Sequence, residues 1–107
     1  MDILVLDTIQ SELAINQEDG VKLFNAIQSI SPADLTLNFI GISRISTAFL
    51  NESIGKFAQI NSSDIEKVNF VYPKENEIFN HKVIDVIENA LMGEEYSNLV
   101  DNALASL

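Results

Sequence analysis

The sequence predicts an α/β fold in which a sheet of about four strands is covered by helices mainly on one face, in the order β-β-α-β-α-β-α-α. The clearest strand is residues 35–40, where Leu35, Leu37 and Phe39 alternate with the residues of the opposite face. Apolar residues at helical steps of three and four precede and follow this strand. Because strands separated by helices favour right-handed crossovers, we expect at least part of the sheet to be parallel.

The first third of the chain predicts two strands and one helix. The apolar runs 3–6 and 13–15 indicate short strands, and the polar stretch 7–12 is expected to join them as a hairpin. Asn16 is a suitable N-cap for a first helix, and Ser31-Pro32 ends it because the residue before proline avoids the α region. The predicted buried face of this helix consists of Leu23, Phe24, Ile27 and Ile30.

After the turn 41–45, a second helix is predicted to begin near Ser46 or Thr47. Its inner face is expected to hold Leu50, Ile54, Phe57 and Ala58.

The rest of the chain predicts one more strand and two helices. Residues 63–66 have capping-box spacing for a single helical turn, and residues 68–72 follow as a strand. A third helix is expected over 75–92, with Gly93 at the C′ position, and a last helix over 94–107. The third helix is predicted to bury Phe79, Val83, Ile87 and Ala90.

The length and the charge set limits on the class of protein. A chain of 107 residues with 47% hydrophobic residues fits a single domain, 1–107. The net charge is −10, and the six basic residues are scattered, which argues against nucleic acid or an anionic membrane as partner. Without a cysteine or a long apolar segment, the sequence predicts a cytoplasmic protein without a membrane span.

Catalytic motifs do not emerge from the sequence, which therefore predicts no enzyme activity, no cofactor and no metal site. The four glycines are too far apart for a phosphate-binding loop. His81 is the only histidine, and its position in the middle of a predicted helix favours an ordinary helical residue. The acidic pair Glu94-Glu95 lacks the alternating spacing of a calcium loop and suits the start of a helix.

The segment 37–57 is the most informative part of the chain, because it leads from a strand through a turn into a helix with two hydroxyls at its start. The first N–H groups of a helix lack partners, so a phosphate attached to Ser46 or Thr47 would be stabilised there. The simpler interpretation is that one of these hydroxyls only caps the helix.

This segment resembles the STAS superfamily, and more closely the STAS-like domains of unknown function of bacteria and their phages. The resemblance extends over about residues 2–92, with Glu18-Asp19-Gly20 and Ser31-Pro32 as further matches, and leaves 94–107 at or beyond its edge. In this segment it depends on the spacing of Leu37, Phe39, Gly41, Ile45-Ser46, Phe49, Ile54 and Gly55.

The resemblance implies a regulatory role like that of anti-sigma-factor antagonists. In such relatives a histidine-kinase-like ATPase binds the domain and phosphorylates a Ser or Thr at this turn. Thr47 matches that hydroxyl by position, and Ser46 stands where an acidic residue usually precedes it. Ala48-Phe49 replaces the usual Ser/Thr-Gly, and Asn38 replaces a common aspartate. Protein binding through the turn tolerates these differences better than phosphorylation does.

The sequence therefore predicts a non-enzymatic regulatory module that binds a protein partner, such as a histidine-kinase-like ATPase or a regulator that it controls. The residues expected at the contact, with Ser46 and Thr47 as the two candidate phosphoacceptors, are Ser46, Thr47, Ala48, Phe49 and Glu52.

The alternative is a small structural protein that associates with itself through the segment 94–107. An apolar stripe recurs there at steps of three and four residues. The stripe could pack on its own domain as an antiparallel neighbour or form the seam of a symmetric dimer. It consists of Tyr96, Leu99, Val100, Ala103, Leu104 and Leu107.

Overall fold

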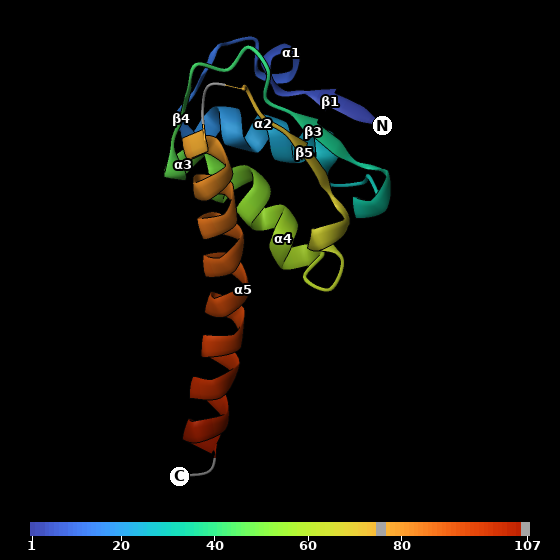
Figure 1. Cartoon of the computed structure of the whole chain (residues 1–107). Coiled ribbons are helices and arrows are strands. Elements are labelled where there is room, and N and C mark those ends of the chain that lie inside the picture. The colour runs from blue at the N-terminus through green and yellow to red at the C-terminus, as the bar shows by residue number, and fades with distance from the viewer. Residues whose placement is uncertain (75–76, 106–107) are drawn as a thin grey trace.

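The computed structural model describes the backbone of residues 1–74 and 77–105, and the side chains of residues 1–74 and 77–92. Within these residues, five short strands form two small parallel sheets, and helices connect them (Figure 1). Glu75 and Leu107, which we assigned to helices from the sequence, lie outside the described residues. The strands are β1 (Asp2–Leu4), β2 (Leu13–Ala14), β3 (Thr36–Asn38), β4 (Arg44–Ile45) and β5 (Asn69–Val71). The α-helices are α1 (Val5–Ile9), α2 (Gln17–Ile27), α3 (Thr47–Leu50), α4 (Lys56–Ile60) and α5 (Glu77–Ala105).

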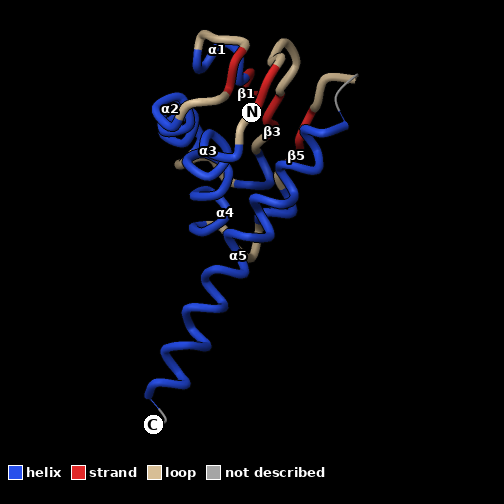
Figure 2. The backbone as a smooth tube through the Cα atoms, turned by 90° about the vertical axis from the view of Figure 1, so that its left-hand side faces the viewer, coloured by secondary structure: helices blue, strands red, loops and turns tan. Residues whose placement is uncertain are grey.

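The larger sheet has the order β1-β3-β5, with both pairs parallel. Its register aligns Ile3, Leu37 and Phe70, so these side chains share one face and pack against the core. On the opposite face the same register aligns Thr36, which is half-buried, with Asn69, which is exposed. Figure 2 shows α2, α3 and α4 gathered on one side of these strands. The parallel pairing and the predicted inward face of residues 35–39 are confirmed.

The predicted hairpin between residues 3–6 and 13–15 is wrong. The chain forms the short helix α1 after β1, and β2 then pairs in parallel with β4 in a separate two-stranded sheet. Val5 and Ile9 are four residues apart and buried, so one apolar face holds this single helical turn on the core. Gln10 ends the helix in a left-handed conformation with φ 57°. The sequence predicts a single sheet of about four strands, whereas the structure has one sheet of three strands and one of two.

The first two predicted helices are present. Asn16 caps α2, because its Oδ1 accepts a hydrogen bond from the Asp19 N–H at 2.8 Å. The helix ends at Ile27, four residues before Ser31, and Pro32 then opens a short 3-10 turn, η1 (Pro32–Asp34). The second helical stretch begins at Thr47, as predicted, and buries the four expected apolar residues. It continues from α3 through a π-helical turn, η2 (Asn51–Gly55), into α4.

The polar turn at residues 63–66 does not form the predicted capping box. A 3-10 turn, η3 (Ile65–Lys67), stands there with Asp64 at its N-cap and without a side-chain capping bond. The strand that follows is β5, shorter at both ends than the predicted 68–72.

The break predicted at Gly93 is also wrong. α5 continues through Gly93 as one helix from Glu77 to Ala105, so the segment 94–105 does not turn back on its own domain (Figures 1 and 2). A glycine inside a helix costs only about 1 kcal/mol relative to alanine, and this is not enough to end a long helix. Phe79, Val83 and Val86 of α5 are buried on the core, and Ile87 and Ala90 are half-buried beside them.

Candidate functional site

The turn between β4 and α3 is held in place mainly by Ser46. The Ser46 Oγ accepts a hydrogen bond from the Phe49 N–H at 3.1 Å, which makes Ser46 the N-cap of α3. The same hydroxyl donates to the Ile15 carbonyl at 2.6 Å, and the Ser46 N–H donates to the Ala14 carbonyl at 3.0 Å. The turn is therefore attached to β2 as well as to its own helix, and the Ser46 hydroxyl has a donor role and an acceptor role already filled.

Phe49 belongs to the core of the molecule and not to its surface. Its side chain is fully buried, so it supports the turn from inside and cannot itself contact a partner. Its carbonyl oxygen faces Gly20 of α2, where a Cβ atom would lie only 2.6 Å away. The close approach of α2 to α3 therefore depends on the missing side chain at Gly20.

Of the five residues predicted at the contact, Thr47, Ala48 and Glu52 have side chains at the surface. Ser46 is half-buried. Thr47 is exposed at the first position of α3, and Ala48 is half-buried next to it. Glu52 is half-buried one turn later and forms an ion pair with Lys56, with 2.6 Å between Oε2 and Nζ. Of the two hydroxyls at the turn, that of Thr47 is the one exposed to solvent.

A groove that the sequence did not predict lies beside the turn, between β4 and the start of α5. Ile15 and Ile78 are 43% and 59% exposed at its rim, which is unusual for such large apolar side chains in one place. Arg44 and Lys82 supply two cations to the same groove. Its lining is completed by Ser43, Ile45 and Phe79.

The charge of this groove differs from that of the chain as a whole. The sequence has a net charge of −10, yet the lining contains two cations and no carboxylate. Lys82 donates from Nζ to the Ile45 carbonyl at 2.9 Å, which blocks the outer edge of β4. Among the described side chains, Arg44 forms no ion pair, whereas Lys22, Lys56 and Lys67 each pair with a carboxylate.

Two features of the sequence are consistent with this groove. Ile78 does not share the helical face of Phe79 and Val83, and Arg44 is the cation closest to the turn in the chain. What the sequence could not indicate is that β2 and the start of α5 both lie beside β4.

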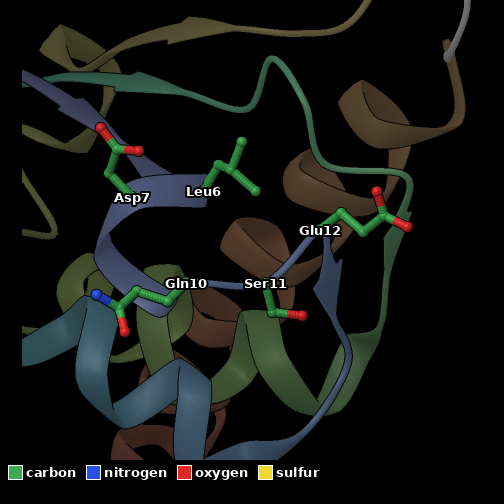
Figure 3. A pocket seen from close by; sticks show the side chains of 5 residues that line it. All are labelled: Leu6, Asp7, Gln10, Ser11 and Glu12. Atoms are coloured by element: carbon green, nitrogen blue, oxygen red, sulfur yellow. The ribbon is translucent and has the colours of Figure 1, made fainter.

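A second hollow lies between α1 and β2, where Asp7 and Glu12 are the acidic lining residues. Figure 3 shows their carboxylates at opposite ends of the hollow, so they do not converge on a common point. Within residues 1–74 and 77–92, no group of three His, Asp or Glu side chains is placed to hold a metal ion.

Two further titratable residues lie near the start of α5. Burial raises the pKa of Tyr72 from its ordinary value of 10.0 to about 12, because desolvation disfavours the charged phenolate. His81 is exposed on α5, as expected of an ordinary helical residue.

Comparisons with protein-family models, with characterised proteins and with solved structures found no match to this chain. The class that the fold defines is thus a compact α/β protein with two small parallel sheets. In the part of the chain that the structure describes, no helix is both long and apolar enough to cross a membrane.

Proposed function

We propose that the protein is a non-enzymatic, STAS-like regulatory module that binds another protein through the turn between β4 and α3. The observation that supports this proposal is the division of roles at the turn. The hydrogen bonds of Ser46 and the burial of Phe49 hold the backbone of the turn in place. The side chains of Thr47, Ala48 and Glu52 therefore lie on a surface that is already formed in the protein without a partner. A preformed surface loses less conformational entropy on binding than a flexible loop does.

The chemistry of the partner follows from the resemblance of the segment 37–57 to STAS-like domains. It is a histidine-kinase-like ATPase, or a regulator that such an ATPase controls, and it acts in the cytoplasm. If the partner transfers phosphate, Thr47 is the hydroxyl that it can reach, because the Ser46 hydroxyl is engaged in two hydrogen bonds.

The test begins with capture of the partner on the full-length protein in an extract of the native host. We expect Thr47→Glu to weaken binding of the captured protein at least about tenfold, because a charge buried in a contact is costly unless it is paired. Ser63→Glu adds the same charge at an exposed position after the C-terminal end of α4 and serves as the matched control.

Equal affinity of the parent and the Thr47 variant would remove the turn from the interface. Incubation of the parent with the captured protein and ATP, followed by intact mass measurement, tests phosphate transfer separately. A mass increase that persists in Thr47→Ala would exclude Thr47 as the acceptor.

Self-association through the C-terminal segment is a second candidate function, and one observation favours it. Because α5 does not turn back at Gly93, the apolar stripe of residues 96–104 is not folded back onto its own domain as a separate antiparallel helix. An apolar stripe that extends beyond its own domain can be buried against a second copy in a symmetric dimer.

A further inference from the structure

The groove beside the turn, between β4 and the start of α5, has walls that hydrogen bonds hold in place. The Ser46 hydroxyl donates to the Ile15 carbonyl at 2.6 Å, which joins the end of β2 to the start of α3. Lys82 of α5 donates from Nζ to the Ile45 carbonyl of β4 at 2.9 Å (Figure 1). The elements around the groove are therefore connected to one another before anything binds, and a formed site loses less conformational entropy on binding.

The size of the groove suits the side chains of a partner protein better than a small molecule. Its volume is about 260 Å³, below the roughly 300–1,000 Å³ that is typical of small-molecule pockets. Ile15 and Ile78 line it from two different parts of the chain and are 43% and 59% exposed. An aliphatic side chain placed between these two residues would remove apolar surface of both from water.

The two cations of the groove are able to bind a carboxylate. Arg44 is exposed, and the described side chains contain no carboxylate that pairs with it. Lys82 uses one of its three N–H donors for the Ile45 carbonyl, so two donors remain for another acceptor. In a chain with a net charge of −10, a groove lined by two cations and no carboxylate favours an acidic ligand.

Carboxylates near the groove limit where the charge of a ligand can lie. Four described carboxylates are within three residues of a lining residue, and none of them lines the groove: Glu12, Glu18, Glu77 and Asp85. Of the two on α5, Asp85 is on the groove side, since it lies about 10 Å beyond Ile78 in nearly the same direction from the helix axis. A ligand carboxylate is therefore disfavoured further along α5 and favoured at Arg44, on the β4 side.

We propose that this groove binds an acidic segment of the protein partner. One aliphatic side chain of that segment lies between Ile15 and Ile78, and a neighbouring Asp or Glu binds Arg44. The inference rests on the proposed function, because the groove adjoins the turn and extends the same contact. It adds the chemistry of the segment that the partner places beside the turn.

The first experiment titrates the full-length protein with short capped peptides and follows the backbone amides by NMR, which detects weak binding. The peptides contain a leucine between two glutamates, a leucine between two glutamines, or an alanine between two glutamates. We expect the leucine–glutamate peptide to shift the amide resonances of Ile15, Arg44 and Ile78. We also expect it to bind at least about threefold more tightly than the other two peptides, since each of them lacks one of the two contacts. Equal binding of the glutamine peptide, or shifts only outside the groove, would overturn the inference.

The second experiment changes the groove and keeps the peptide. Arg44→Glu is expected to weaken binding of the leucine–glutamate peptide at least about threefold and to improve binding of a peptide with lysines in place of the glutamates. Lys67→Glu makes the same change in net charge in η3, outside the groove, and is the matched control. Ile78→Ala is expected to weaken the leucine–glutamate peptide as well, with Ile60→Ala as its control, because Ile60 has the same exposure of 59% on α4.

The amide spectrum of each variant shows whether it is folded, and both Arg44 and Ile78 are exposed, so the substitutions are expected to leave the fold intact. A leucine–glutamate peptide that binds the parent and folded Arg44→Glu equally would overturn the inference.

The captured partner separates the groove from the turn. If Thr47→Glu weakens its binding and Arg44→Glu does not, the proposed function stands and the groove inference is overturned. If Arg44→Glu weakens its binding and Thr47→Glu does not, the groove inference stands and the turn is removed from the contact.

Discussion

At the scale of single residues, Gly20 shows how one missing side chain determines the approach of two helices. A Cβ atom at Gly20 would lie 2.6 Å from the Phe49 carbonyl oxygen and 2.8 Å from the Glu52 Cβ. Both distances are shorter than non-bonded atoms allow, and one of the two neighbours is backbone. Helix α2 can therefore lie against α3 at this distance only with glycine at this position.

We predict that Gly20→Ala lowers the free energy of unfolding by about 1–3 kcal/mol, as overpacked core substitutions do. This change in stability has the opposite sign to the usual effect, because replacing glycine by alanine inside a helix normally stabilises the helix by about 1 kcal/mol. Gly55→Ala is the matched control: its nearest obstacle is the Val86 Cγ1 at 3.3 Å, a side-chain atom that can move slightly. Denaturant unfolding of both variants tests this, and a Gly20 variant as stable as the parent would show that the helices cross differently.

A second glycine is required by backbone conformation. Gly41 has φ +92° in the turn that follows β3, a conformation that other residues rarely adopt. The turn it forms sends the chain toward β4, and in this way it positions the candidate site.

At the scale of elements, the helical stretch from Thr47 to Ile60 contains an internal irregularity. The π-helical turn at Asn51–Gly55 interrupts regular α-helix, and such turns disturb the usual pattern of backbone hydrogen bonds. Ser53 lies within it, fully buried, and its hydroxyl donates to the Phe49 carbonyl at 2.9 Å. A buried hydroxyl is thus satisfied locally, which permits a polar residue inside an otherwise apolar core.

Phe39 connects three elements of the core. Its ring stacks on Tyr72 with centroids 5.8 Å apart and meets Phe79 of α5 edge-on at 6.4 Å. It follows β3 directly and is fully buried. The contact of the larger sheet with α5 therefore depends strongly on this one ring.

We predict that Phe39→Ala lowers the free energy of unfolding by about 3–5 kcal/mol, because it removes a large buried ring and leaves a cavity. The neighbouring Ile40 is 52% exposed, so Ile40→Ala serves as the control, with an expected change within about 0.5 kcal/mol. Equilibrium denaturation followed by circular dichroism compares the two. Similar losses for both variants would contradict the assignment of the inner face.

At the scale of the whole molecule, the radius of gyration reflects the extension of α5. It is 14.7 Å, whereas a compact domain of this length has about 13 Å. The buried apolar core of the described residues contains no residue beyond Val86, and Leu91 is the last residue that packs against it in part. Beyond these residues, α5 continues to Ala105 and runs away from the sheets and the other helices (Figures 1 and 2).

We predict that deletion of residues 94–107 leaves a cooperatively folding domain, with a free energy of unfolding within about 1 kcal/mol of the parent at concentrations where the parent is monomeric. At higher concentrations the parent is expected to become more stable than the shortened chain, because association stabilises only the folded state. Thermal unfolding at several concentrations tests both statements. Aggregation or loss of a cooperative transition after deletion would mean that residues 94–107 belong to the core.

The sequence by itself determined the features that depend on local periodicity and capping. The alternation of residues 35–39, the Asn16 cap and the start of the second helix at Thr47 each require only neighbouring residues, and each was predicted correctly. The start of the helix at the candidate turn follows from the same local signals, but β4, which precedes it, lies within residues 41–45, where the sequence predicts only a turn. Phe49 of the candidate turn was placed at the surface although the helical pattern also fits burial, and only packing distinguishes the two.

Only the tertiary structure decided the features that depend on pairing over long distances. The residues of β1 and β2 alone do not show whether these strands pair with each other as a hairpin or with β3 and β4. Their actual partners lie about 30 residues away in the chain. The one-turn helix α1 is too short to form without packing, and the groove exists only because β2, β4 and α5 converge. Short segments have several conformations of similar free energy, and contacts between distant parts of the chain decide which one forms. Local sequence patterns therefore do not predict the strand pairing or the groove.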